Sequence, residues 1–182
     1  MNDSSRAITG PQWRAPEVFA AAERPAVLWS WLTHTGSLTA RLRERCAEFN
    51  VCVLRVAEIA LDDDEAAWIG AARAVVREVF LRCGETPWIY ARTLAVDDDP
   101  AARLRSLGEM PLGAWAFAQS GTGRDGLEIA CVHAPDALYQ RVAAAEAAAK
   151  PSALWCRRSV LNAGGESLYI CECFFEDGTP WR

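Results

Sequence analysis

The chain has 182 residues, of which 51% are hydrophobic and 24% are charged, and its formal net charge is −5. This composition fits one globular domain, residues 1–182, whose core needs no metal or disulfide to be stable. An acidic chain without a basic block is poorly suited to nucleic acids or anionic membrane surfaces, and no stretch is apolar enough to span a bilayer. No signal-peptide pattern follows Met1, so we expect a cytoplasmic protein.

The segment before residue 50 is predicted to be mainly helical. Residues 1–15 are polar and are expected to form a loose arm. Residues 16–34 have a helical pattern that is interrupted near Pro25. Ser37 is suited to cap a second helix, whose apolar stripe begins at Leu38. Together these segments predict a helical hairpin that forms a flap or buttress for the rest of the domain.

Most of the remaining chain is predicted to form β-strands joined by short turns. Aliphatic and aromatic residues dominate six segments: 51–59, 74–83, 88–96, 127–132, 154–161 and 167–175. The turn-forming residues at 84–87 and 163–166 predict two β-hairpins. Strands joined in this way favour a single antiparallel sheet, and with the helices the sequence predicts an α+β fold.

Other segments interrupt these strands. Residues 62–64 are three aspartates, which we expect in a solvated loop because they lack the alternating spacing of a calcium site. A helix is predicted to start after Asp99 as its cap and to end near Gly108, and residues 111–117 predict another short helix. Residues 135–150 are mostly alanine, which favours a helix, but the apolar face is weak. We therefore expect a helical insertion on the surface there.

The seven cysteines are an odd number and form no C-x-x-C pair. They are Cys46, Cys52, Cys83, Cys131, Cys156, Cys171 and Cys173. Most lie in apolar segments, so we expect small buried side chains in a reducing cytosol. The two histidines, His34 and His133, have no ligand spacing to a cysteine, so no zinc site is predicted.

Two residues of opposite charge lie on strand faces that are otherwise apolar. Strand alternation puts Arg77 on the same face as Val79, and Glu172 on the same face as Ile170. A charge on an apolar face is costly unless it is paired or contacts a ligand. A guanidinium can bind a carboxylate through two hydrogen bonds, and a glutamate can hydrogen-bond a hydroxyl or ether oxygen. The pair therefore predicts a pocket for a small ring that carries a carboxylate at one end and an oxygen at the other.

The same residues also fit purely structural roles. Arg77 could form an internal ion pair or lie at a sheet edge, and Glu172 could be the partner of Arg92, Arg157 or Arg158. Charge pattern alone leaves both interpretations open. An interaction protein with internal Arg–Glu pairs is a further alternative, and it would have no pocket between Arg77 and Glu172.

Several motifs, in the same order along the chain, resemble the chorismate lyase family from about Leu28 to Phe175. They are VREVFL (76–81), GETPW (84–88), ART (91–93), LGEMPLG (107–113), WCRRS (155–159) and LYICECF (168–174). The resemblance implies an antiparallel sheet with helical flaps over a buried product. It implies an enzyme of the ubiquinone pathway that cleaves chorismate into 4-hydroxybenzoate and pyruvate without a metal or an organic cofactor. We also expect this enzyme to be a cytoplasmic monomer.

The resemblance also assigns roles by motif position. Arg77 matches the arginine that binds the ring carboxylate, and Glu172 matches the glutamate at the oxygen end of the ring; these two are the predicted catalytic residues. Leu38 and Leu112 match flap positions whose backbone groups help to hold the ligand. Two departures are a leucine at 38, where some relatives have methionine, and the long alanine-rich segment 135–150. Since the fold family includes ligand-binding domains of transcription regulators, a non-catalytic sensor of aromatic acids is the alternative function.

Overall fold

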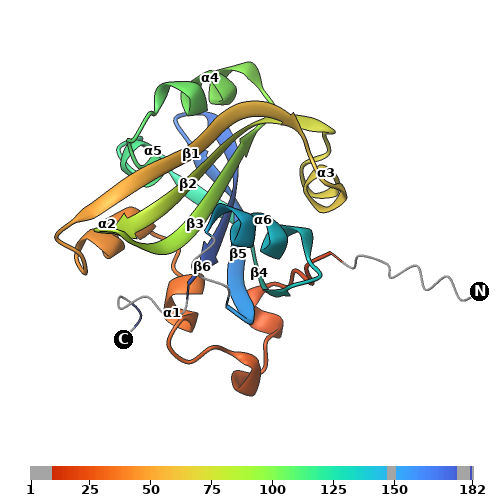
Figure 1. Cartoon of the computed structure of the whole chain (residues 1–182). Coiled ribbons are helices and arrows are strands. Elements are labelled where there is room, and N and C mark those ends of the chain that lie inside the picture. The colour runs from red at the N-terminus through yellow and green to blue at the C-terminus, as the bar shows by residue number, and fades with distance from the viewer. Residues whose placement is uncertain (1–9, 147–150, 176–180, 182) are drawn as a thin grey trace, which may run out of the picture.

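The computed structural model describes residues 10–146, 151–175 and 181, and a six-stranded antiparallel sheet forms its centre (Figure 1). The strands lie in the order β1-β2-β3-β6-β5-β4. Their bounds are β1 Phe49–Ala60, β2 Arg73–Cys83, β3 Thr86–Ala95, β4 Gly123–His133, β5 Ala153–Ala163 and β6 Glu166–Phe174. The predicted α+β fold with a single antiparallel sheet is confirmed.

Two hairpins build the middle of the sheet, as the turn residues predict. β2 and β3 are joined through Gly84 at φ +55°, and β5 and β6 through Gly164 and Gly165 at φ +59° and +82°. Only glycine adopts these positive φ values without strain, so the two turns are determined locally. Pairing of β3 with β6 then joins the hairpins, and each strand contributes alternate side chains to each face.

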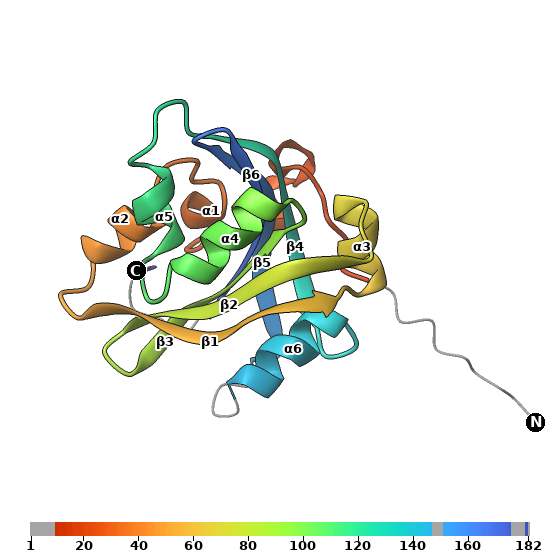
Figure 2. The same cartoon turned by 90° about the horizontal axis from the view of Figure 1, so that it is seen from above.

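Helices cover both faces of the sheet. Their bounds are η1 Pro16–Val18, η2 Ala21–Glu23, α1 Trp29–Leu32, α2 Leu38–Arg43, α3 Asp63–Ile69, α4 Asp98–Ser106, α5 Leu112–Ala116 and α6 Ala137–Ala145. Figure 2 shows α1, α2, α4 and α5 together on one side of the sheet, with α6 on the other. The sheet separates two hydrophobic clusters, one including Leu42 and Phe174 and the other including Phe80 and Val142. No described helix is long and apolar enough to cross a membrane.

The N-terminal prediction is partly wrong. In place of a helix over residues 16–34 the chain forms two single 3₁₀ turns and the four-residue helix α1. Pro25 disfavours helical conformation at Arg24, whose ψ of 128° is extended. The predicted cap at Ser37 is confirmed, because its side chain accepts a hydrogen bond from Ala40 N at the start of α2. Of the expected loose arm, residues 1–9 lie outside the described residues.

The structure corrects two predictions that concern the starts of helices α3 and α4. Residues 62–64 do not form a solvated loop, because Asp62 caps α3 by accepting from Glu65 N. The helix expected to start at Pro100, with Asp99 as its cap, begins two residues earlier, at Asp98, since proline is tolerated anywhere in a first turn whose N–H groups have no helical acceptor. Gly108, at φ +51°, follows its last turn as predicted.

The alanine-rich segment 135–150 contains a helix, α6, whose expected surface position is wrong; residues 147–150 lie outside the described residues. Leu138, Tyr139 and Val142 are buried in the cluster on the second face of the sheet. Three large apolar residues at helical spacing are enough to bury one face, although the remaining residues are small.

A disulfide joins Cys46 to Cys83, which corrects the expectation of seven free thiols. Cys46 follows α2, and Cys83 ends β2, so the bond ties the segment after α2 to the sheet. The other five cysteines are not part of a disulfide, and three of them are buried. A pair separated by 37 residues has no local sequence signature, because only the β1–β2 pairing brings its members together.

Reduction of this disulfide is expected to lower the free energy of unfolding by about 2–4 kcal/mol, because the bond closes a long loop in the unfolded chain. Denaturant unfolding with and without dithiothreitol measures the difference. Cys46→Ser should show the lower stability in both conditions, whereas Cys52→Ser, which changes a free cysteine, should keep the response to dithiothreitol. Equal stability of the oxidised and reduced protein would contradict this expectation.

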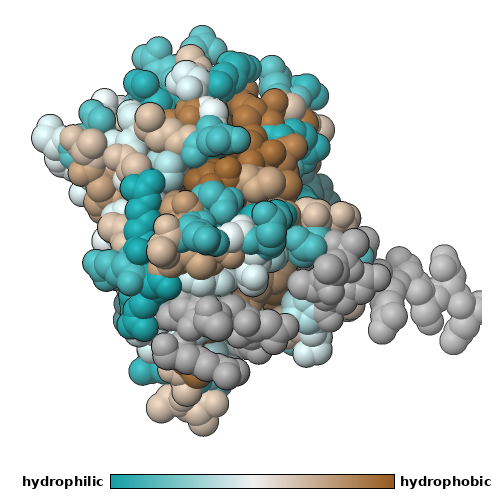
Figure 3. All heavy atoms as spheres, turned by 60° about the vertical axis from the view of Figure 1, so that its left-hand side comes forward, coloured by the Kyte–Doolittle hydropathy of each residue, from teal (hydrophilic) through white to brown (hydrophobic). Residues whose placement is uncertain are grey.

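Hydrophobic side chains also gather on the outside, in the upper half of the surface in Figure 3, with hydrophilic residues around them. Among the described residues, the exposed large apolar ones are Val18, Val27, Leu54, Val96, Met110 and Phe117. Met110 and Phe117 lie on either side of α5 in the sequence. A shift of this short helix would therefore change the amount of apolar surface in contact with water.

Candidate active site

A cavity of about 40 Å³ lies between the sheet and the two short helices α2 and α5. Its lining contains all four residues that the sequence predicts for the site: Arg77, Glu172, Leu38 and Leu112. Leu38 and Leu112 are the first residues of α2 and α5, where backbone N–H groups have no acceptor within the helix. The arrangement fits two flaps, α2 and α5, that cover a polar ligand with their helix starts.

Register and strand alternation bring the two charges to one face. Arg77 pairs with Thr93 across β2 and β3, and Glu172 pairs with Ala91 across β6 and β3. Thr93 and Ala91 are two residues apart on β3, so they and their partners share a face. Two strand spacings and a two-residue offset separate the backbones of Arg77 and Glu172 by roughly 12 Å. The side chains thus extend into one cavity from its two ends.

Arg77 is a buried cation with no carboxylate partner. Arg77 is only 2% exposed, and its Nη2 donates to the carbonyl oxygens of Gly108 (2.9 Å) and Met110 (3.1 Å). Its Nε has no partner, and no carboxylate of the described residues lies within ion-pair distance of it. Burial lowers the pKa of Arg77. Because an uncompensated buried charge is costly, this environment favours an anionic ligand.

Glu172 is buried but paired. It accepts a hydrogen bond from Arg157 Nε at 2.6 Å, and Arg124 Nη1 lies 3.7 Å from the same oxygen. Burial raises the pKa of Glu172, but the charges of Arg157 and Arg124 and the Arg157 hydrogen bond outweigh it, so the pKa lies below its ordinary value. Glu172 is therefore ionised and acts as a hydrogen-bond acceptor. It is the internal partner of Arg157 and also lines the cavity.

Arg157 connects Glu172 to the end of α1. It is fully buried, and its Nη1 donates to the carbonyl oxygens of Trp31 (2.9 Å) and His34 (2.7 Å), just before α2. One guanidinium thus holds both the carboxylate on β6 and the segment from which the α2 flap starts. The orientation of Glu172 is coupled in this way to the position of that flap.

The two flaps approach each other closely at Gly113. A Cβ atom added there would lie 2.9 Å from Thr39 Oγ1 and 3.4 Å from Ser37 Oγ, so α5 packs against α2 only because residue 113 has no side chain. Thr39 is buried, which limits its freedom to turn away. Both Thr39 and Gly113 line the cavity.

Gly113→Ala is expected to loosen this contact and to weaken ligand binding by about 10-fold, which corresponds to about 1.4 kcal/mol of lost flap closure. Isothermal titration with 4-hydroxybenzoate, the product that the motif resemblance implies, measures the change. Thr39→Ala in the same chain removes the clashing oxygen and should restore most of the affinity. Unchanged affinity in Gly113→Ala would mean that the flaps do not need to meet at this point.

Arg124 and Thr39 are cavity residues that the sequence interpretation missed. The strand was predicted to begin at residue 127, whereas β4 begins at Gly123. An irregularity in pairing between Asp125 and Glu128 interrupts the alternation that would have placed Arg124 on the cavity face. An arginine next to a glycine-rich turn is the sequence signal that could have indicated Arg124 as a cavity residue.

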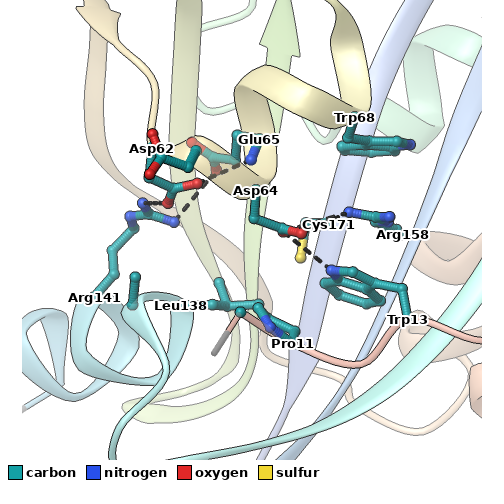
Figure 4. A pocket seen from close by; sticks show the side chains of 13 residues that line it. Pro11, Trp13, Asp62, Asp64, Glu65, Trp68, Leu138, Arg141, Arg158 and Cys171 are labelled. Carbon is teal, nitrogen blue, oxygen red and sulfur yellow. Dashed lines mark hydrogen bonds and ion pairs between the residues drawn. The ribbon is translucent and has the colours of Figure 1, made fainter. Parts of the chain in front are cut away.

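A larger cavity of about 450 Å³ lies on the other face of the sheet, between α3, α6 and the N-terminal segment (Figure 4). Figure 4 shows Arg158 between the rings of Trp13 and Trp68, with its carbon Cζ 4.5 Å and 4.9 Å from their centroids. Arg158 also pairs with Asp64 and Glu128.

The remaining arginine in its lining is paired as well, since Arg141 bridges to Asp62 and Glu65. Trp13 additionally donates to Asp64, which ties the described end of the N-terminal segment to α3. The charges of this larger cavity therefore stabilise the packing of α3 and α6. The smaller cavity under the flaps is the stronger candidate site because it holds an unpaired cation.

This chain is similar to known proteins both in sequence and in fold. The sequence model of the family described as chorismate lyase matches residues 11–180. A "Probable chorismate pyruvate-lyase" from Aromatoleum aromaticum (strain EbN1) is 41% identical over 157 residues, covering 82% of this chain and 85% of the relative. Another of that name, from Azoarcus sp. (strain BH72), is 40% identical over 175 residues, or 91% of each chain.

Solved structures share the fold at low sequence identity. The effector domain of PhnF from Mycobacterium smegmatis aligns with a TM-score of 0.53 at 18% identity, covering 78% of this chain and 90% of that domain. A PhnF C-terminal domain aligns with a TM-score of 0.55 at 14% identity, covering 75% of this chain and 88% of the other. At such identities the similarity concerns the fold alone.

Proposed function

Because the chain belongs to the chorismate lyase family, we propose that it converts chorismate into 4-hydroxybenzoate and pyruvate. The observation that carries this proposal is the buried Arg77, which has no carboxylate partner in the described part of the chain, in one cavity with an ionised Glu172. A ring acid with an oxygen opposite its carboxylate complements both groups. The relatives that carry the name match most of this chain and are matched over most of their own length.

The proposed reaction balances without a further reactant. The bond between ring carbon C3 and the ether oxygen breaks, the hydrogen on C4 leaves the ring, and the enolpyruvyl methylene carbon gains a hydrogen. The ring becomes aromatic and the enolpyruvyl group leaves as pyruvate. Since aromatisation makes the reaction favourable, the protein's task is to hold the reactive conformer and to exclude water.

Each cavity residue then has a defined role. Arg77 anchors the ring carboxylate, and Glu172 accepts a hydrogen bond from the ring hydroxyl. Arg157 is a positioning residue that holds Glu172, since it donates to that carboxylate at 2.6 Å. Backbone groups of Leu38 and Leu112 complete the enclosure of the ligand. Glu172 does not serve as a proton donor in this scheme, because its lowered pKa keeps it ionised.

The size of the cavity gives the flaps a kinetic role. At about 40 Å³ the cavity is small, and the contact between the two flaps at Thr39 and Gly113 covers it on the side away from the sheet. Entry of substrate and exit of product thus require α2 and α5 to move apart. Because both ends of the ring are held, we expect product release to be slow and 4-hydroxybenzoate to inhibit the enzyme.

The cellular role is part of the same proposal. 4-Hydroxybenzoate is a ring precursor of ubiquinone, so we propose the first committed step of ubiquinone biosynthesis, carried out by a cytoplasmic monomer that binds no nucleic acid. A reducing cytoplasm would keep Cys46 and Cys83 as thiols. Denaturant unfolding in dithiothreitol measures the stability of the protein with these two cysteines reduced.

Incubation of the purified protein with chorismate, with and without a chelator, tests the proposal. Chromatography should detect 4-hydroxybenzoate and pyruvate in equal amounts, at the same rate in both samples. Binding of chorismate without turnover would instead favour the sensor of aromatic acids. Neither binding nor turnover would favour the interaction protein.

A further inference from the structure

Unmet hydrogen-bond donors of the described residues concentrate at the cavity under the flaps. Buried guanidinium nitrogens without a partner include Nε of Arg77, Nε of Arg124 and Nη2 of Arg157. Arg77 and Arg124 line the cavity, and Arg157 lies directly behind Glu172. Three arginines thus lie around one carboxylate, Glu172, which pairs with Arg157 and Arg124 but not with Arg77, so positive charge is in excess. One carboxylate on the ligand satisfies Arg77 but leaves this second group of donors unused.

Arg124 is held in place but is not neutralised. It lies near the start of β4, opposite Leu161, and its side chain is 5% exposed. Its Nη1 donates to Ser159 Oγ at 2.6 Å, whereas the nearest oxygen of Glu172 is 3.7 Å away and already accepts from Arg157. A buried guanidinium with a free Nε can still donate to a further anion.

The strand order places the two cavity arginines on opposite sides of Glu172. Arg77 lies on β2, Glu172 on β6 and Arg124 on β4, so two strand spacings separate Glu172 from each arginine across the sheet. The register adds an offset along the strands of two residues for Arg77 and of four residues for Arg124. A ligand with carboxylates at both ends and an oxygen between them would contact all three groups. Chorismate has this form, because it carries one carboxylate on the ring and another on the enolpyruvyl group.

We propose that Arg124, oriented by the Ser159 hydroxyl, forms a second carboxylate subsite that binds the enolpyruvyl carboxylate while Arg77 binds the ring carboxylate. This proposal rests on the proposed function, since it names the substrate group that the same cavity recognises. 4-Hydroxybenzoate has only the ring carboxylate, so Arg124 distinguishes substrate from product. The contact favours substrate without strengthening product inhibition.

Two stable probes test the subsite without turnover. 3-(Carboxymethoxy)benzoate carries a second carboxylate through an ether at the ring position that bears the enolpyruvyl group in chorismate, and 3-methoxybenzoate lacks that carboxylate. In the unmodified protein the first should bind about 30-fold more tightly, as a buried charged hydrogen bond implies. Arg124→Met should remove this preference and change the affinity for 3-methoxybenzoate less than 3-fold. Arg77→Met should weaken the binding of both probes.

Further variants separate binding from folding. Arg124→Lys keeps the charge and should retain part of the preference, and Ser159→Ala removes only the orienting hydroxyl and should reduce it several-fold. If Arg124→Met does not fold, these two variants decide the question, and an unchanged preference in both overturns the subsite. An equal loss of affinity for both probes in Arg124→Met also overturns the subsite, since a general structural role of Arg124 would produce that result.

The two proposals can fail separately. If the protein prefers the dicarboxylate probe through Arg124 but releases no pyruvate from chorismate, the lyase activity is wrong and the subsite stands. If chorismate is cleaved and Arg124→Met leaves KM for chorismate within 3-fold of the unmodified value, the subsite is wrong and the lyase activity stands.

Discussion

Replacing Arg77 with methionine is expected to raise KM for chorismate and the dissociation constant of 4-hydroxybenzoate by about 10²- to 10³-fold. The change removes a charge-assisted contact to the ring carboxylate in a buried site, which contributes about 3–4 kcal/mol to binding. kcat should fall much less, because the contact holds substrate and product alike. Initial rates over a range of chorismate concentrations and titration with 4-hydroxybenzoate measure both constants.

The same variant is expected to be at least as stable as the unmodified protein. Arg77 is a buried cation without a counter-charge, and an apolar side chain of similar length removes that cost. Arg82→Met is a matched control on the same strand, because Arg82 lies outside the cavity lining and pairs with Glu85 and Glu146. A gain in stability together with unchanged KM in Arg77→Met would show that Arg77 does not bind the substrate.

Glu172→Gln is expected to lower kcat by about 10²-fold while KM changes only a few-fold. Glutamine retains the shape but loses the charge that orients the ring hydroxyl, and loss of one preorganised electrostatic contact has an effect of this size. Stability should also fall by about 3 kcal/mol, because Arg157 remains buried without its counter-charge. Steady-state kinetics and denaturant unfolding measure the two effects.

Glu78→Gln separates these two effects. Glu78 is equally buried, pairs with the buried Arg92 and lies on the other face of the sheet. This variant should lose some stability, though less than Glu172→Gln because Arg92 keeps its pair with Glu65. It should keep kcat within about 3-fold, since Glu78 is absent from the cavity lining. Normal kcat in Glu172→Gln would remove this carboxylate from the mechanism.

Local patterns were sufficient for the sheet and for the first two site residues. Turn residues at 84–87 and 163–166 determine where the chain reverses, and period-two alternation determines the face of Arg77 and of Glu172. The family motifs added Leu38 and Leu112, which the structure brings to the same cavity. These signals are readable because each depends on residues close together in the chain.

Partners of charges were not predictable in this way. Among three candidate arginines the sequence did not indicate which would pair with Glu172, and the structure selects Arg157, 15 residues away on β5. Residues 62–64 appeared to be a solvated loop because their partners, Arg141 and Arg158, lie far along the chain. Ion pairing depends on distances in space, which alternation does not determine.

The sequence by itself determined the strands, their turns and the faces of Arg77 and Glu172, because backbone sterics and hydrophobic alternation act over a few neighbouring residues. Tertiary structure alone decided that these faces coincide, that Arg77 is unpaired while Glu172 is held by Arg157, and that Arg124 joins them. It also paired Cys46 with Cys83. The physical reason is that strand order and register set the distances between remote side chains, and charge interactions and covalent bonding between them depend on those distances.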